Sequence, residues 1–123
     1  MKAKPPVLVI DDNENSLLLD KDMLEIAGFE VFEAANASGG IALARQERPD
    51  IIIMDVQLPD MSGYDAARVL RQDHETLDIP IVFVTASVTS EDKDKIAGIP
   101  NSTFIRKPIN TRTFAEDIRL LIK

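Results

Sequence analysis

Short apolar runs alternate along this chain with segments of helical period, and this alternation limits the possible folds more than any other feature. Three runs are almost wholly apolar, as in strands that are buried on both faces: Val7–Ile10, Ile51–Met54 and Ile81–Val84. Two further runs alternate in polarity and carry charge, as edge strands do: Glu30–Ala34 and Thr103–Arg106. We therefore predict five strands.

The segments between and after these runs predict five helices. They are Ser16–Ala27, Ala37–Glu47, Tyr64–Gln72, Ser90–Ala97 and Thr111–Ile122. In the first helix we expect Leu17, Leu18 and Leu24 to pack in the core. Regular alternation of strand and helix predicts a three-layer α/β fold with right-handed crossovers. A chain of 123 residues suits one domain, which we place over residues 1–123.

The composition of the chain limits the kinds of partner that it can bind. The formal net charge of -7 disfavours nonspecific binding to nucleic acid or to anionic lipid. No apolar run approaches the ~20 residues that a membrane-spanning helix needs. The chain has no cysteine, so neither a disulfide framework nor a thiolate metal site is available. We expect no nucleic-acid partner, no membrane association and a cytoplasmic location.

Polar side chains follow four of the five apolar runs, at the point where each strand should end. Asp11 and Asp12 follow the first run, Asp55 the third, Thr85 the fourth and Lys107 the fifth. In an open parallel sheet, ligands bind outside the carboxyl ends of the strands. We therefore expect three carboxylates, one hydroxyl and one amine to share a pocket.

Three clustered aspartates need a cation, because like charges held close together disfavour ionisation. The available ligands are oxygens, which favours Mg²⁺, with Mn²⁺ possible, over zinc. Lys107 and Thr85 are suited to hold phosphoryl oxygens. Asp55 would be held rigidly by the buried run before it, and such a carboxylate can attack phosphorus to give an aspartyl phosphate.

Four stretches of the sequence, taken together, resemble the receiver domain of two-component response regulators. They are VLVIDDNE at 7–14, DIIIMDVQLPDMSG at 50–63, IPIVFVTA at 79–86 and FIRKP at 104–108. The resemblance covers essentially the whole chain and is of the stand-alone, chemotaxis-like or cell-cycle-regulator-like type. It implies a flavodoxin-like (βα)5 fold with a five-stranded parallel sheet in the order 2-1-3-4-5.

The resemblance also implies roles for individual residues. Asp55 would be the phosphoacceptor and would take its phosphoryl group from a histidine kinase or a histidine phosphotransfer protein. Mg²⁺ would be held by Asp12, Asp55 and the backbone carbonyl of Gln57, with Asp11 acting through water. The chain would then be a signalling switch that catalyses only its own phosphorylation and dephosphorylation.

Switching residues follow from the same resemblance. Thr85 and Lys107 would hold phosphoryl oxygens, and Phe104 stands where the family has an aromatic residue that changes rotamer. The Lys107–Pro108 peptide bond is expected to be cis. A downstream protein would bind the face made by the fourth helix, fifth strand and fifth helix.

Some alternatives stay open, and two departures from the family are visible. A phosphatase of the haloacid dehalogenase type also uses a strand-end aspartate, but it needs a second aspartate where this chain has Gln57. The chain could be a stand-alone regulator, which Met1 and a helix ending near Lys123 fit, or part of a larger protein.

The stretch AGIPNSTF at 97–104 departs from the family pattern and predicts a shortened fourth helix with a longer loop after it. With no sequence after Lys123, we expect no output domain. We assign no function to His74.

Overall fold

The computed structural model describes residues 4–122 of the chain, so Met1 and Lys123, the ends of the predicted domain, lie outside the described residues. Five strands are present: β1 (Pro6–Ile10), β2 (Glu30–Ala34), β3 (Ile51–Asp55), β4 (Ile81–Thr85) and β5 (Ser102–Arg106). Five helices alternate with them: α1 (Glu14–Ile26), α2 (Ala37–Glu47), α3 (Gly63–Arg71), α4 (Ser90–Ala97) and α5 (Phe114–Leu121). None of the described helices is long and apolar enough to cross a membrane.

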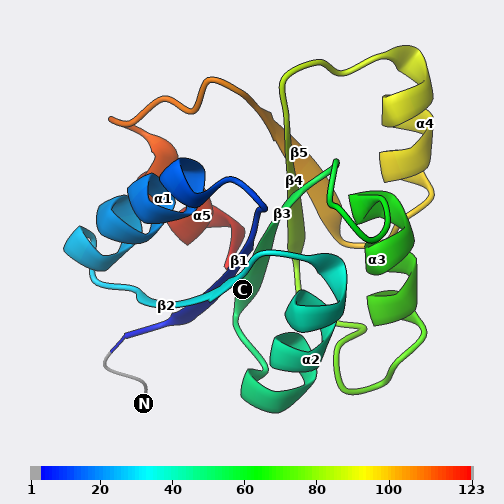
Figure 1. The fold of residues 1–123 in the computed structure, drawn as a ribbon, viewed down its shortest axis with the longest axis horizontal. Helices are drawn as coiled ribbons and strands as arrows, with labels where there is room; N and C mark the ends of the chain where they lie inside the picture. The colour runs from blue at the N-terminus through cyan, green and yellow to red at the C-terminus, as the bar shows by residue number, and fades with distance from the viewer. Residues whose placement is uncertain (1–3, 123) are drawn as a thin grey trace.

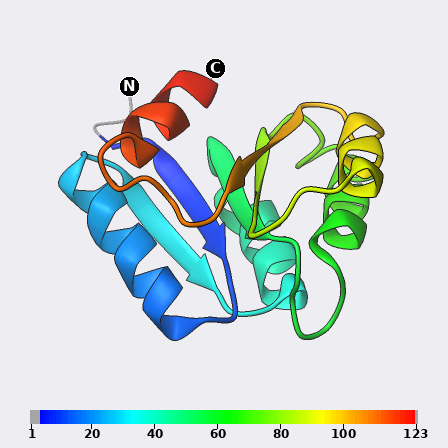
Figure 2. The ribbon, with the colours of Figure 1, turned by 90° about the horizontal axis from the view of Figure 1, so that it is seen from above.

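The strands form one parallel sheet in the order β2-β1-β3-β4-β5. Helices α1 and α5 cover one face of this sheet, and α2, α3 and α4 cover the other (Figures 1 and 2). The predicted three-layer α/β fold and its strand order are confirmed. The two charged strands, β2 and β5, are the edges, as their alternating polarity predicted.

Side-chain caps explain where the helices begin. Asn13, Asn36 and Ser62 each accept a hydrogen bond from the backbone N–H three residues later, and Thr89 forms a reciprocal capping box with Asp92. The cap at Asn13 starts α1 two residues before the predicted Ser16. Helix α5 starts only at Phe114, three residues later than predicted, and its Thr113 N-cap makes no side-chain hydrogen bond. Helix α4 spans the predicted eight residues, Ser90–Ala97, and Gly98 is its C-cap.

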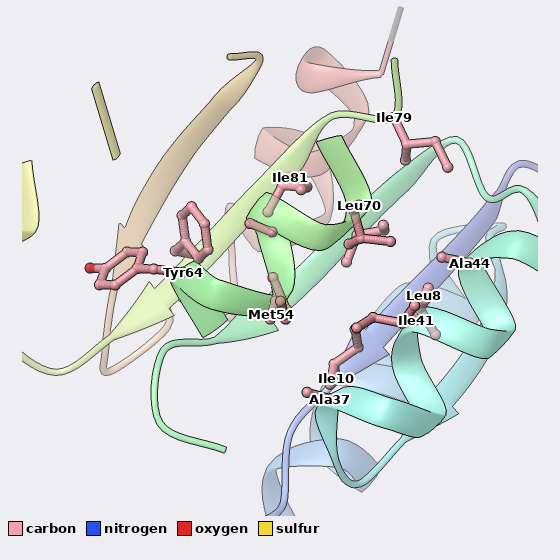
Figure 3. Packing of buried hydrophobic residues seen from close by; sticks show 14 of the residues in the cluster. Leu8, Ile10, Ala37, Ile41, Ala44, Met54, Tyr64, Leu70, Ile79 and Ile81 are labelled. Carbon is pink, nitrogen blue, oxygen red and sulfur yellow. The ribbon is translucent and has the colours of Figure 1, made fainter. Parts of the chain in front are cut away.

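Two apolar clusters hold the layers together, one on each face of the sheet. Figure 3 shows the larger cluster, in which Ile10 of β1 lies beside Ile41 of α2, and which also contains Met54 of β3 and Tyr64 of α3. In the other cluster, Val9 packs with residues of α1 and α5. Alternate residues of each central strand point into opposite clusters, which explains why these strands are continuously apolar.

One of the three core predictions for α1, that Leu18 is buried, is wrong. Leu17 and Leu24 are buried, but the Leu18 side chain is 58% exposed. Helical period is the reason: residues at positions 17, 20 and 24 share one face, and position 18 lies about 100° around the helix from position 17. The buried residue between the two leucines is instead Asp20, which is only 4% exposed.

Candidate functional site

Three carboxylates meet at the carboxyl ends of the two central strands. The pairing of Ile10 with Met54 across β1 and β3 brings the residues after them, Asp11 and Asp55, to the same level of the sheet. Oxygens of Asp11, Asp12 and Asp55 all lie within 4.8 Å of one another. Asp11 is buried, Asp55 is half-buried and Asp12 is exposed. The cluster therefore opens to solvent on the Asp12 side.

Hydrogen bonds fix the Asp55 carboxylate in place. Its Oδ1 accepts from the backbone N–H of Gln57 at 3.1 Å, and its Oδ2 accepts from Lys107 Nζ at 3.1 Å. The same Lys107 nitrogen lies 3.8 Å from Asp11 Oδ2. The lysine comes from the loop after β5, where the Lys107–Pro108 peptide bond is cis. One ammonium group thus partly neutralises two of the three clustered acids.

The charges of the site shift the pKa values of its members. Burial raises the pKa of Asp11, although the backbone N–H of Asn13 and the nearby Lys107 act in the opposite direction. For Lys107, burial acts to lower the pKa, but its hydrogen bond and attraction to Asp55, with Asp11 and Asp20 adding to them, raise the pKa above its usual value. The ammonium form of Lys107 is therefore the form that the site holds.

The loop between β3 and α3 follows Asp55 directly and is held by backbone and side-chain contacts. The backbone N–H of Gly63 donates to Val56 O at 2.7 Å, and a Cβ at Gly63 would overlap the backbone carbonyl of Asp55. Asp60 in this loop accepts hydrogen bonds from the backbone N–H groups of Ala37 and Ser38, at 2.8 and 2.9 Å. These bonds, which lower the pKa of Asp60, anchor the loop to the first turn of α2.

Thr85 and Phe104, two of the three residues predicted to bind phosphoryl oxygens or to switch, make no hydrogen bond to Asp55 in this structure, whereas the third, Lys107, does. Thr85 ends β4, next to the strand that carries Asp55, and its hydroxyl donates to Ser87 O at 3.0 Å. Phe104 on β5 pairs opposite Phe83 of β4. Its side chain is half-buried against the apolar cluster on the sheet face that α2, α3 and α4 cover. A hydroxyl at Thr85 would have to leave Ser87 to reach a group bound at Asp55.

The donor set of the cluster fits a hard divalent cation. All its side-chain donors are carboxylate oxygens, and neither a histidine nor a cysteine is among them. Mg²⁺ prefers such oxygen ligands and is commonly bound through one or two carboxylates, with waters completing its shell. Asp12, the exposed member, has room for such waters.

Sequence analysis missed Asp20, which lies next to the site. This aspartate is on the buried face of α1, and its charge and that of Asp11 influence each other and Lys107. The signal was present: an acid occupies the apolar stripe midway between Leu17 and Leu24.

A parallel (βα)5 sheet with an aspartate cluster and a lysine at its carboxyl edge defines a phosphoacceptor domain of the two-component type. A sequence model of the response regulator receiver domain matches residues 7–119. The chain belongs to the response regulator receiver domain family.

Similar proteins agree with this assignment. The polar-differentiation response regulator DivK of Brucella anthropi is 36% identical over 113 residues, which cover 92% of each chain. Chemotaxis protein CheY4 of Vibrio cholerae is 28% identical, covers 98% of this chain and 100% of its own, and superposes with a TM-score of 0.92. The receiver domain of sensor histidine kinase PA1611 of Pseudomonas aeruginosa is 28% identical, with coverage of 97% and 95% and a TM-score of 0.83.

The function of the class follows from these findings. The chain is the receiver domain of a response regulator and has a phosphoacceptor role in two-component signalling. Domains of this class interact with histidine kinases and with downstream effectors. The PA1611 receiver structure holds a magnesium ion in its active-site cleft.

Proposed function

We propose that Asp55 is the phosphoacceptor of this domain, which we take to be a single receiver domain over residues 1–123. The observation that carries the proposal is the contact of the Asp55 carboxylate with Lys107 Nζ at 3.1 Å, beside the carboxylates of Asp11 and Asp12. Of the three acids, Asp55 alone is both bonded to the lysine and positioned on the central strand β3. Its side chain is also partly exposed, to 14%, on the side where the cluster opens to solvent, so a phosphodonor can reach it.

The reaction is a phosphoryl transfer from a phosphohistidine on a histidine kinase or a histidine phosphotransfer protein. An Asp55 carboxylate oxygen forms a bond to phosphorus, the phosphorus–nitrogen bond breaks, and its electron pair stays on the imidazole nitrogen. Lys107 stabilises negative charge on the phosphoryl oxygens. Hydrolysis returns the domain to its unphosphorylated state. Water attacks phosphorus, the bond between phosphorus and the Asp55 oxygen breaks, and the Asp55 carboxylate is restored with release of inorganic phosphate. The domain thereby promotes its own phosphorylation and dephosphorylation.

The residues of the cluster would hold Mg²⁺. We assign Asp12, Asp55 and the backbone carbonyl of Gln57 as direct ligands, with Asp11 acting through water. When bound, the cation offsets charge on the acids and on the phosphoryl oxygens. This assignment is supported by the all-oxygen donor set and by the magnesium ion in the PA1611 receiver domain.

Phosphorylation of Asp55 would act on a partner by changing the surface made by α4, β5 and α5. Phosphorylation replaces the single charge of the Asp55 carboxylate with about 1.5 to 2 negative charges on a phosphoryl group, which brings three acceptor oxygens. Thr85 would then exchange its hydrogen bond to Ser87 O for one to a phosphoryl oxygen, and Phe104 on the neighbouring strand would repack into the vacated space. We propose that the face of α4, β5 and α5 transmits this change to a downstream protein.

Asp55→Asn tests the site assignment. With acetyl phosphate and Mg²⁺, the parent should gain one phosphoryl group by intact mass, and Asp55→Asn should gain none. Asp50→Asn, which removes an acid just before β3, is the matched control and should be phosphorylated like the parent. Undiminished incorporation in Asp55→Asn would place the phosphoryl group elsewhere. Many turnovers on small phosphate esters would instead indicate a phosphatase.

A further inference from the structure

A pocket of about 450 Å³ lies beside the phosphorylation site, between α1 and the loop that leads from β5 to α5. Figure 1 shows this loop passing next to the first half of α1. The volume falls in the range of roughly 300 to 1,000 Å³ that is typical of small-ligand sites. The pocket shares Asp11 and Lys107 with the phosphorylation site, but its remaining lining residues belong to neither the acid cluster nor the predicted switch.

Asp20 of α1 lines this pocket with a carboxylate that the chain itself does not satisfy. The residue is only 4% exposed. Within residues 4–122, no hydrogen bond or ion pair is made by its side chain. The nearest source of positive charge is Lys107, whose Nζ is already engaged with Asp55 and Asp11. Asp20 therefore faces the pocket without a hydrogen-bond or ion-pair partner in residues 4–122, and its oxygens keep access to solvent there, because no fully buried side-chain oxygen in these residues lacks a partner.

Such a group is unfavourable for folding unless something binds it. Burial raises the pKa of Asp20 to about 6, and the negative charge of Asp11 adds to the effect. An apolar residue at this position would continue the stripe formed by Leu17 and Leu24 and would avoid this penalty. A cation in the pocket would offset the same penalty by pairing with the carboxylate.

The rest of the pocket decides which kind of cation fits. Its ionisable lining groups are Asp11, Asp20 and Lys107, so carboxylates outnumber ammonium groups. Its other walls include the apolar side chains of Leu19, Pro108 and Ile109. A bare metal ion would leave these walls unused, whereas an alkyl chain would cover them.

We propose that this pocket binds an aliphatic cation, an alkylammonium or alkylguanidinium group, with its charge beside Asp20 and its alkyl chain against Leu19 and Ile109. Either a free organic cation or the basic side chain of a bound protein supplies this chemistry. The site is distinct from the acceptor carboxylate, so binding does not require phosphorylation of Asp55.

Titration of the ¹⁵N-labelled chain with n-butylguanidinium chloride, with magnesium chloride present, tests the proposal. We expect saturable shifts of the backbone amides of Asp20 and Ile109, weaker binding of unsubstituted guanidinium and no binding of butyrate. Asp20→Asn should weaken n-butylguanidinium binding at least about tenfold, because a charged hydrogen-bonded pair is lost. Asp22→Asn, which removes an exposed acid of the same helix, should leave the affinity unchanged.

The two sources of the cation are distinguished by a blocked Gly-Arg-Gly peptide in the same titration. Tighter binding of the peptide than of n-butylguanidinium assigns the site to a protein side chain, and the opposite order assigns it to a small molecule. Equal affinity of the parent and Asp20→Asn, or shifts confined to Asp12 and Asp55, would overturn the proposal. Neither result bears on phosphorylation at Asp55, which intact mass measures separately.

Discussion

At the scale of single residues, the site depends on which charges have partners. Lys107 is shared between Asp55 and Asp11, whereas Asp20 is buried without a bond from the described chain. A paired carboxylate is stabilised by its neighbours, and an unpaired buried one is destabilised. Removing the charge of a paired carboxylate should therefore lower the stability of the domain, whereas removing the charge of Asp20 should raise it.

Asp20→Asn should stabilise the free domain at neutral pH. The pKa of Asp20 is about 6 in the folded chain against 3.8 in the unfolded chain, so the folded chain binds more protons between these values and its stability falls as pH rises through them. The penalty is complete above about pH 6 and absent below about pH 4. We expect Asp20→Asn to raise the free energy of unfolding by about 1 to 3 kcal/mol at neutral pH, after allowance for solvent in the pocket.

Urea unfolding across this pH range checks the expectation, with Asp22→Asn as the control. The stabilisation by Asp20→Asn should shrink as the pH is lowered from 7 towards 4. A constant difference between parent and Asp20→Asn at all pH values would show that the carboxylate charge is not its cause.

Asp12→Ala should weaken Mg²⁺ binding. Its carboxylate lies within 4.8 Å of those of Asp11 and Asp55, and its loss removes both a ligand and a charge from a hard-cation site. We expect the dissociation constant to rise at least about tenfold. Calorimetry suits the measurement, because the chain has no tryptophan. Asp22→Ala should bind Mg²⁺ like the parent, and equal affinity in Asp12→Ala would place the metal elsewhere.

At the scale of secondary-structure elements, polar side chains join segments that are distant in the sequence. Asp60 ties the β3–α3 loop to α2, and the Tyr64 hydroxyl donates to Asp92 at 2.9 Å to join α3 to α4. The most extensive link is Arg71 at the end of α3. Its guanidinium donates to four backbone carbonyls, from Thr76 and Ile79 before β4 and from Pro100 and Asn101 before β5.

Arg71→Met should loosen both loops that the guanidinium joins. The substitution keeps the aliphatic packing but leaves part-buried carbonyls without a charged donor, so we expect a loss of about 2 to 3 kcal/mol in the free energy of unfolding. Arg68→Met, which breaks an exposed ion pair with Asp65, should change it by less than about 1 kcal/mol. Urea unfolding gives these values. Hydrogen exchange at Ile81, whose N–H bonds to Asn101 O, should quicken in Arg71→Met alone.

At the scale of the whole molecule, the sheet connects the acceptor to the proposed output face. Asp55 ends the central strand, Thr85 ends the next strand, and Phe104 lies on the edge strand beyond. A modification shifts a conformational equilibrium only through a group that interacts differently with the two states. We propose that in this chain the Thr85 hydroxyl, which donates to Ser87 O in the present structure, is that group.

Thr85→Ala should uncouple Phe104 from the acceptor. With Mg²⁺ and the phosphoryl mimic beryllofluoride, the parent should show shifted NMR signals of the Phe104 ring, and Thr85→Ala should show a reduced shift although it still binds the mimic. Thr85→Ser keeps the hydroxyl and should respond like the parent. A full Phe104 response in Thr85→Ala would show that the hydroxyl does not carry the coupling.

The sequence by itself determined the strand order, once the resemblance was stated, and the meeting of Asp11, Asp12, Asp55 and Lys107 at one edge of the sheet. Apolar runs and helical period are local properties, and parallel strands present their carboxyl ends together, so these features can be read without a structure. The helical period of α1 also carried the exposure of Leu18 and the burial of Asp20, which the prediction of the core overlooked. Only the tertiary structure decided that the Asp20 carboxylate has no bonded partner in the described chain and that Arg71 holds two loops. Both features depend on groups that are distant in the chain, a side-chain partner for Asp20 and backbone carbonyls for Arg71, and residue type at one position does not encode them.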